Sequence, residues 1–401
     1  MKVLLADALP DTAVEQLETA GDEVTCLPDL TAETLPDAIA GYEVLVVRST
    51  IVTATALQAA NKLGLIVRAG AGTNTIDCDR AAELGIFVCN VPGKNALAVA
   101  ELTMGLLIAV DRHISAATAD LRAGTWNKKA YSNADGLFGR RMGIIGLGDI
   151  GIATAARASA FGIDVVAVAK PGRNHAAVAR AEAAGVRWLD DLDELLTSCD
   201  IVSIHVPGAP DTKGLVNADF LATMKEGAIL LNTSRGDVVD EAALIDALNS
   251  RGIRAGLDVF ANEPDSGTGD FDSALAKHPS VVATHHVGAS TAQAQSAITD
   301  GTLEAIDAYR AGSPINCVNL NPVPTRAATL TVRHHDRVGV LANVLQALRK
   351  EQLNVSNMQN RVFAGSKAAV ASIDVGHLPS QELIDEVMSL DDVIYVSVTP
   401  A

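Results

Sequence analysis

The sequence predicts an α/β protein built on parallel sheets and followed by a small separate βαββαβ module. Three observations support this fold class. Short apolar runs alternate with helical segments over residues 2–286, as in sheets whose parallel strands are joined by crossover helices. A glycine-rich turn joins one such run to an Ala-rich helix at residues 141–161. Residues 326–401 then change to a pattern of four strands and two helices, typical of a ferredoxin-like module.

The glycine-rich turn predicts a dinucleotide site. Its glycines have the spacing Gly-x-Gly-x-x-Gly, with a strand directly before them and a helix and second strand after them. Gly146 permits the tight turn, Gly148 lets the backbone approach a pyrophosphate, and Gly151 allows the helix to pack on the strand. Asp149 and Ile150 begin the helix, so we expect them beside the phosphates.

Composition limits the classes of partner. The chain has 401 residues, enough for two to three domains, and 48% of them are apolar. A formal net charge of −17 argues against a nucleic-acid partner or an anionic membrane surface. The five cysteines are scattered and lack the spacing of a zinc site. We therefore expect reduced thiols and no bound metal. Neither a signal segment nor an 18-residue apolar run is evident, so a cytoplasmic protein is expected.

Two arginines end predicted strands in the first part of the chain. The strand 44–47 leads into Arg48 and Ser49, and the next strand ends in Arg68, ahead of the loop that contains Ala71 and Gly72. Ligands of open α/β sheets meet the carboxyl ends of the strands. These residues therefore predict a site for an anionic substrate. After them, residues 96–119 predict one long helix crossing between domains.

Three further motifs place polar residues just past predicted strands. They are Asn-Thr-Ser-Arg235-Gly, Leu-Asp258-Val-Phe-Ala-Asn-Glu263-Pro and Thr-His-His286-Val-Gly-Ala-Ser. In this order after the glycine turn, they resemble the D-isomer-specific 2-hydroxyacid dehydrogenase family. The resemblance covers roughly residues 1–320 and implies two Rossmann-like domains. It assigns residues 1–95 and 287–320 to a substrate-binding domain and residues 96–286 to an inserted NAD(P)-binding domain.

The chemistry of this family can be argued from three of these residues. Oxidation of a 2-hydroxy acid needs a base for the hydroxyl proton, and His286 is the candidate because imidazole titrates near neutrality. Glu263 would orient it and stabilise the imidazolium. Arg235 offers a planar fork for the substrate carboxylate. Relatives often carry proline at the position of His285, and we expect His285 and His286 to point apart because strand side chains alternate.

The resemblance implies further site residues. Backbone groups near Ala71 and Gly72 would hold the carboxylate, and Asp258 would meet the nicotinamide carboxamide. Other positions that match the cofactor lining are His205, Val206, Pro207, Thr233 and Gly288. NAD is the expected cofactor. The usual carboxylate after the second strand is missing, and Lys170 and Arg173 follow instead, so NADP use is also expected.

Within the family the chain is most similar to the phosphoglycerate dehydrogenases. Arg48, Ser49 and Arg68 fall where those enzymes bind the 3-phosphate, and Lys128 matches a cation supplied by a neighbouring subunit of a homodimer or homotetramer. The implied reaction is oxidation of 3-phosphoglycerate to 3-phosphohydroxypyruvate, the first step of the phosphorylated L-serine pathway. Two alternatives stay open. One is a glyoxylate, hydroxypyruvate or other D-2-hydroxyacid reductase, and the other is a non-catalytic regulator that senses dinucleotide.

Residues 326–401 resemble the ACT module, which binds amino acids between subunits. A linker, residues 321–324, precedes it. His334 and Asn354 match ligand positions of serine-inhibited relatives, while Asp336 replaces an amide there. An amino-acid effector is therefore expected, with serine bound weakly because an ionised Asp only accepts hydrogen bonds. The alternative is a dimerising sheet that binds no ligand.

Overall fold

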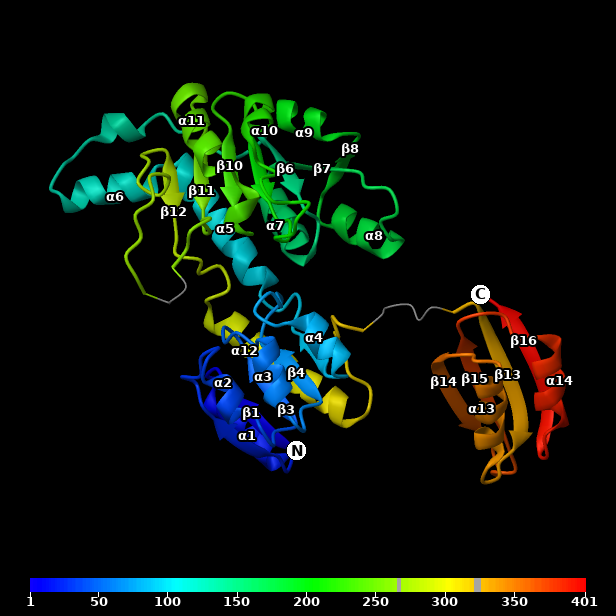
Figure 1. Ribbon diagram of the computed structural model, residues 1–401. Helices are drawn as coiled ribbons and strands as arrows, with labels where there is room; N and C mark the ends of the chain where they lie inside the picture. The colour runs from blue at the N-terminus through cyan, green and yellow to red at the C-terminus, as the bar shows by residue number, and fades with distance from the viewer. Residues whose placement is uncertain (265–267, 321–325) are drawn as a thin grey trace. The chain divides into compact units, whose positions relative to one another are not determined.

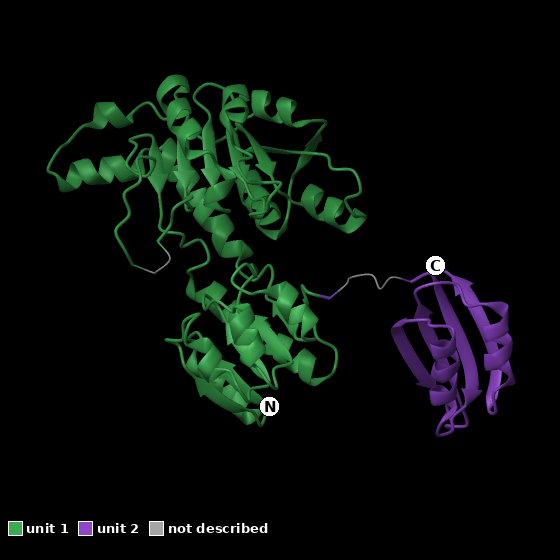
Figure 2. Ribbon diagram, in the orientation of Figure 1, with its two compact units in different colours: residues 1–319 green, residues 320–401 purple. Residues whose placement is uncertain are grey.

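The chain divides into two compact units. The computed structural model describes residues 1–264, 268–320 and 326–401, with the elements labelled in Figure 1. The first unit is Met1–Asn319 and the second is Leu320–Ala401 (Figure 2). The predicted linker, residues 321–324, lies outside the described residues.

A five-stranded parallel sheet opens the first unit, with strand order β2-β1-β3-β4-β5. The order changes direction between β1 and β3, and such a switch point is where open α/β sheets bind ligands. Its strands are β1 (Lys2–Leu5), β2 (Glu23–Cys26), β3 (Val44–Val47), β4 (Leu65–Arg68) and β5 (Phe87–Asn90). Its helices are α1 (Asp11–Thr19), α2 (Leu35–Ala38), α3 (Ala54–Ala59), α4 (Cys78–Glu83) and α12 (Ala292–Arg310).

A seven-stranded parallel sheet follows, with strand order β12-β11-β10-β9-β6-β7-β8 and a switch point between β6 and β9. Its strands are β6 (Arg141–Ile145), β7 (Asp164–Val168), β8 (Arg187–Leu189), β9 (Ile201–Ile204), β10 (Ile229–Asn232), β11 (Arg254–Leu257) and β12 (Val281–Ala283). The helices of this region are α5 (Ala96–Asp111), α6 (Ile114–Arg122), α7 (Asp149–Ala160), α8 (His175–Ala183), α9 (Leu192–Ser198), α10 (Ala218–Thr223) and α11 (Glu241–Arg251). Two short 3₁₀ turns are η1 (Lys128–Tyr131) and η2 (Gly236–Val238).

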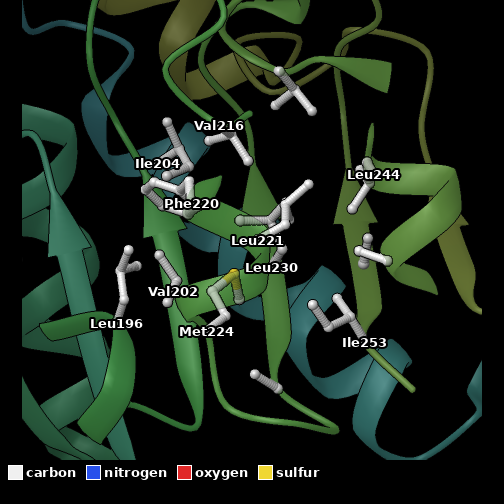
Figure 3. Close-up of a cluster of buried hydrophobic side chains, with 14 of the residues drawn as sticks. Leu196, Val202, Ile204, Val216, Phe220, Leu221, Met224, Leu230, Leu244 and Ile253 are labelled. Atoms are coloured by element: carbon white, nitrogen blue, oxygen red, sulfur yellow. The ribbon is translucent and has the colours of Figure 1, made fainter. Parts of the chain in front are cut away.

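Both faces of the seven-stranded sheet are buried, because strand side chains alternate between faces. In β10, Leu230 joins the core beneath α9, α10 and α11, part of which is drawn in Figure 3. Its neighbours Ile229 and Leu231 join the core formed with α5, α7 and α8 on the opposite face. This two-sided burial explains why the strands appear in the sequence as continuous apolar runs.

The prediction of one long helix over residues 96–119 is wrong. Helix α5 ends at Asp111, His113 has a left-handed φ of 54°, and α6 then begins. Asp111 is fully buried and accepts hydrogen bonds from Gly136 N–H and Arg140. The chain turns away from the sheet at this point, as Figure 1 shows for α6. No residue of α6 is buried.

The second unit is antiparallel, with strand order β14-β15-β13-β16. Its elements are β13 (Ala328–His335), α13 (Val340–Lys350), β14 (Val355–Val362), β15 (Ala368–Val375), α14 (Gln381–Ser389) and β16 (Val393–Pro400). Side chains from both helices and from three of the strands form its core. The predicted βαββαβ order is confirmed.

The predicted fold class is confirmed: two parallel α/β sheets and a small antiparallel module. The domain boundaries expected at residues 95, 286 and 320 stay predictions. Over the described ranges, no helix is long and apolar enough to span a bilayer. The cytoplasmic location stays a prediction as well.

Candidate active site

The glycine-rich turn has the geometry that a dinucleotide site needs. Gly146 has a φ of 99°, and a Cβ there would overlap the backbone of His205. A Cβ on Gly151 would overlap the carbonyl oxygen of Gly146, so the helix and the turn approach too closely for a side chain. Above Gly148, by contrast, no described atom lies within 4 Å of a Cβ position. This open space at the start of α7 leaves room for a pyrophosphate.

His205 follows β9 on the other side of the switch point. Its Nε2 is hydrogen-bonded to Ser203 Oγ at 2.8 Å, whereas its Nδ1 is buried and has no partner. Burial lowers the pKa of His205 to about 4, so the ring is neutral at physiological pH. A buried, unpaired nitrogen next to the glycine turn fits a group that forms a hydrogen bond with a cofactor.

The other predicted cofactor residues differ in their exposure and in their hydrogen-bond partners. Asp149 begins α7 and pairs with Arg180 at 2.7 Å, and Ile150 after it is half-buried. Val206 packs against the core, while Pro207 is exposed and its carbonyl accepts from Thr212 at 2.6 Å. The Thr233 hydroxyl lies 2.9 Å from that of Thr103, which donates to the Val99 carbonyl, so Thr233 donates to Thr103.

The two cations after β7 differ in their surroundings. Lys170 is exposed. Arg173 donates to the carbonyl of Leu147, which lies between the first two glycines of the turn, at 3.1 Å. Its guanidinium carbon lies 5.8 Å from the centroid of the Trp188 ring, and its Nε is buried without a partner. Arg173 is therefore held against the glycine turn.

His286 and Glu263 form the pair that the sequence predicts. His286 Nδ1 lies 2.6 Å from Glu263 Oε2, and Glu263 Oε1 accepts from Phe260 N–H at 2.8 Å. The hydrogen bond to Glu263 raises the pKa of His286 above its ordinary value, although burial opposes this. Burial pushes the pKa of Glu263 up, but the hydrogen bonds from His286 and Phe260 lower it overall. The pair leaves Nε2 of His286 for a substrate.

The backbone at His286 differs from the expectation. β12 ends at Ala283, so the argument that alternation along a strand makes His285 and His286 point apart does not apply. His286 instead has a left-handed φ of 52°, unusual for a residue that is not glycine.

Asp258 holds the loop that carries His286. Its Oδ1 accepts from Thr284 Oγ1 at 2.6 Å and Val287 N–H at 2.9 Å, and its Oδ2 accepts from Gly288 N–H at 2.9 Å. Its carbonyl also accepts from His286 N–H at 2.7 Å. The carboxylate keeps a single free acceptor position on Oδ2, which is enough for one carboxamide N–H. A sequence argument missed Thr284, although it lies directly after a strand.

Arg235 lies in a turn that is held by hydrogen bonds of the Asn232 side chain. The Asn232 amide donates to the Arg235 carbonyl at 2.9 Å and accepts from Ser234 N–H at 3.0 Å. A Cβ on Gly72 would lie 3.4 Å from Arg235 Nη2, so this guanidinium faces the Ala71–Gly72 loop. Asn90 supports that loop by donating to the Ala71 carbonyl at 2.6 Å.

Arg68 lies near both Arg48 and Arg235. Burial lowers the pKa of Arg68, and the positive charges of Arg235 and Arg48 lower it further. Arg68 Nε is also buried without a hydrogen-bond partner. Arg68 thus has two positively charged neighbours and an unpaired donor, a combination that suits an anionic ligand.

Asp7 positions the segment after β3, and sequence analysis missed it. Its carboxylate accepts from Arg48 N–H at 2.7 Å and from Ser49 N–H and Thr50 N–H, each at 3.1 Å. The Ser49 hydroxyl also donates to Asp7, at 2.6 Å, and is engaged there. Burial raises the pKa of Asp7, but these donors lower it overall. Because Asp7 follows β1, the strand-end rule that selected Arg48 could have found it.

Lys128 lies on η1 in an exposed segment, and its charge is not among those that shift the pKa of Arg68. Its supply from a neighbouring subunit stays a prediction. Residues 114–138, which include η1, carry four exposed apolar side chains: Ile114, Leu121, Trp126 and Phe138.

The predicted effector residues do not meet within one chain. His334 is buried, with Nδ1 2.8 Å from the His335 carbonyl and Nε2 3.2 Å from Asn360 Oδ1. Asp336 follows the carboxyl end of β13, whereas Asn354 precedes Val355, which pairs through β15 with the first residue of β13. Ala328 and His335, at the two ends of β13, are seven residues apart, which is about 23 Å of strand. One chain therefore cannot bring Asp336 and Asn354 together, and binding of an effector between subunits stays a prediction.

In the described part of the chain, no cluster of three or more His, Cys, Asp or Glu side chains suits a metal ion.

Comparison with known proteins identifies the family. The profile described as D-isomer specific 2-hydroxyacid dehydrogenase, NAD binding domain, matches residues 104–288. The chain is 41% identical over 298 residues to a hydroxypyruvate reductase of Thermotoga maritima, covering 73% of this chain and 93% of that protein. The chain belongs to the D-isomer-specific 2-hydroxyacid dehydrogenase family. The predicted family and its NAD-binding domain are thus confirmed.

Two further members of the family show how far the similarity extends. A D-3-phosphoglycerate dehydrogenase of Methanocaldococcus jannaschii is 39% identical over 327 residues, which are 81% of this chain and 60% of that protein. The chain thus spans about three fifths of the length of that relative. The crystal structure of a D-isomer-specific 2-hydroxyacid dehydrogenase from Polaromonas sp. superposes with a TM-score of 0.70 at 32% identity, covering 79% of this chain and 99% of that one.

The first prediction concerns the pH dependence of alcohol oxidation. Neutral imidazole accepts the proton, so kcat/KM should rise as the pH passes upward through the pKa of His286, which Glu263 raises. Glu263→Gln should lower that pKa and move the rise to lower pH. The plateau should fall by about 10-fold or more because the imidazolium loses its counter-charge. If kcat/KM falls at the same acidic pH in both proteins, this role of Glu263 is contradicted.

The second prediction concerns Thr284, with Thr284→Ser as the matched control. Thr284→Val removes the hydroxyl that donates to Asp258 and loosens the loop of His286. We expect kcat to fall by about 10-fold with little change in KM, since one lost hydrogen bond to a charged group is of that size. The acid limb should also move to lower pH as His286 leaves Glu263. The serine variant should behave like the parent, and equal losses in both variants would argue against the hydroxyl.

Proposed function

We propose that this chain oxidises 3-phosphoglycerate to 3-phosphohydroxypyruvate, the first step of the phosphorylated L-serine pathway. The observation that carries the proposal is the arginine cluster beside the His286–Glu263 pair. A 2-hydroxy acid with one carboxylate needs Arg235 alone. Arg48 and Arg68, with the unpaired Nε of Arg68, provide for a second anionic group on the same substrate.

The catalytic residues have distinct roles in this proposal. Arg235, with backbone groups of Ala71 and Gly72, holds the carboxylate and orients the carbinol carbon. His286 takes the hydroxyl proton at Nε2, and Glu263 stabilises the resulting imidazolium through Nδ1. The cofactor NAD, when bound over the glycine turn, accepts the hydride. The free acceptor position of Asp258 and the unpaired Nδ1 of His205 would help to hold it.

A reductase of hydroxypyruvate or a related 2-keto acid is the second candidate. The similarity to the Thermotoga maritima hydroxypyruvate reductase favours it, since that relative matches over 93% of its length. The same catalytic groups serve either direction, because imidazolium donates the proton when a ketone is reduced. The positive charges of Arg48 and Arg68 argue against an unphosphorylated substrate, which would have no second anionic group for them to bind. A non-catalytic dinucleotide sensor would have no use for a base with a raised pKa.

We also propose that the active enzyme is a homodimer or a homotetramer. Residues 114–138, which include α6 and η1, carry four exposed apolar side chains that a second copy could cover. Trp126 is 80% exposed and Phe138 is 89% exposed, and burial of such rings is a main source of interface stability. This arrangement would bring Lys128 of one copy toward the arginine cluster of the other.

Finally, we propose that the second unit acts as an ACT-like regulatory module that binds an amino acid between copies. Asp336 and Asn354 lie at opposite ends of one sheet, so a complete site needs Asn354 from another copy. β14 is an edge strand with an exposed face, available for such pairing. The alternative of a dimerising sheet without ligand rests on the same exposed edge.

The third prediction concerns the substrate. Purified protein should oxidise 3-phosphoglycerate far better than glycerate, and His286→Ala or Arg235→Ala should lower kcat by about 10² or more. Lys128→Ala should raise KM by about 10-fold, more than it lowers kcat, because it removes a phosphate contact. Its matched control is Lys129→Ala, which should change little. Equal activity on phosphorylated and unphosphorylated substrates would contradict the proposal.

The fourth prediction concerns the cofactor. Because no carboxylate follows β7, discrimination for NAD over NADP should be weaker than about 10³-fold, which would need about 4 kcal/mol. Lys170→Asp should increase that discrimination by repelling the 2′-phosphate. The measurement is kcat/KM for both cofactors. A parent strictly dependent on NAD, with no change in the mutant, would contradict it.

The fifth prediction concerns regulation. Serine should inhibit the parent only slightly at millimolar concentration, because the carboxylate of Asp336 repels that of serine. Asp336→Asn restores a donor and should strengthen inhibition. Inhibition curves of both proteins with 3-phosphoglycerate test this, and strong inhibition of the parent would show the electrostatic argument to be wrong.

A further inference from the structure

Two cysteines face each other across the edge of the five-stranded sheet. Cys89 lies in β5, and Cys317 lies in the segment that follows α12. They form an antiparallel bridge, with backbone hydrogen bonds of 2.9 and 3.2 Å between the residues on either side of the pair. Cys89 and Cys317 are thus a non-hydrogen-bonded pair, whose Cα atoms lie about 4.5 Å apart in such ladders.

The two sulfur atoms are already close together. Cys89 Sγ lies 3.1 Å from Cys317 Sγ, although both are free thiols here. A Cα spacing of about 4.5 Å falls within the range that disulfides span. The bond can therefore form by rotation of the side chains while the backbone stays in place.

We propose that Cys89 and Cys317 are a disulfide-forming pair that takes a small-molecule disulfide as oxidant. The bond fastens the segment after α12 to β5. This proposal does not rest on the proposed enzymatic function. Thiol–disulfide exchange is reversible, so the pair is a site of reversible modification.

The chemistry proceeds by two thiol–disulfide exchanges. The Cys317 thiolate attacks one sulfur of the small disulfide, forms a mixed disulfide and releases one thiolate. Cys89 then attacks Cys317 Sγ, which forms the internal bond and releases the second small thiolate. The protein loses two electrons and two protons, and the small disulfide gains them as two thiols.

The surroundings of the two thiols decide the order of attack. Cys89 is fully buried, whereas Cys317 is half-buried between the exposed residues Asn316 and Val318. The oxidant therefore meets Cys317 first. Burial raises the pKa of Cys89, which disfavours its thiolate, but its position beside Cys317 compensates through proximity.

The bond would lock a junction that side chains already hold. Asn319 accepts from Val88 N–H at 2.9 Å and donates to the Ile86 carbonyl at 2.8 Å. The disulfide would close a loop across 228 positions of sequence, and long loops gain most from such a bond. Next to Cys89, Asn90 supports the Ala71–Gly72 loop, so the bond lies close to the candidate substrate site.

The test is oxidation of the full chain with oxidised glutathione, followed by peptide mapping without reductant. We expect one internal disulfide that joins the peptides of Cys89 and Cys317, two fewer free thiols and no retained glutathione at either position. Melting of the oxidised protein should occur about 5 °C or more above that of the reduced protein. Dithiothreitol should reverse both changes.

Two variants complete the test. Cys317→Ala, at a half-buried position that should tolerate it, should abolish the disulfide and the melting shift, whereas the matched control Cys26→Ala should retain both. A stable mixed disulfide with glutathione on Cys317 would show that the pair cannot close and would overturn the proposal. Oxidation that leaves both thiols free, or a melting shift that persists in Cys317→Ala, would overturn it equally.

Discussion

The four hydrogen bonds that Asp258 accepts hold the loop that carries His286, and the proposed chemistry depends on them. A buried carboxylate is costly unless donors surround it, and residues 284–288 supply those donors. In return, the loop keeps His286 in a left-handed conformation that an ordinary residue seldom adopts. The imidazole then lies where Glu263 can hold Nδ1 and leave Nε2 for a substrate. The same hydrogen bonds therefore offset both the strain at His286 and the cost of burying Asp258.

A second constraint is the convergence of strand ends at two switch points. In the seven-stranded sheet, β6 and β9 lead into the glycine turn and His205, the groups that fit a dinucleotide. In the five-stranded sheet, β1 and β3 lead into Asp7 and Arg48. Asp7 neutralises part of the local positive charge and fixes the backbone after β3. A protein with a net charge of −17 thus keeps a small cluster of positive charge around Arg68, which suits an anion.

The second unit has its own core, and its proposed site differs from that of the first unit. Its predicted effector residues lie at opposite ends of one sheet, and His334 already uses both ring nitrogens within the chain. Regulation through this unit would therefore depend on assembly of copies. The exposed β14 edge and the apolar surface around η1 are separate surfaces on which that assembly can rest.

Local patterns in the sequence were enough to predict the fold class and the glycine turn, and with the family resemblance they also indicated Arg235, Glu263 and His286. Each of these depends on neighbours in the chain: apolar runs form strands, glycines permit turns, and polar residues after strands face the ligand edge. The break at His113 and the roles of Asp7, Thr284 and Asn90 could not be obtained this way. The partners of Asp7, Thr284 and Asn90 lie 19 to 43 residues away, and the break at His113 accompanies long-range bonds to the buried Asp111. The sequence by itself determined which chemical groups are present, and only the tertiary structure decided their partners, because hydrogen bonds form between atoms that folding brings together.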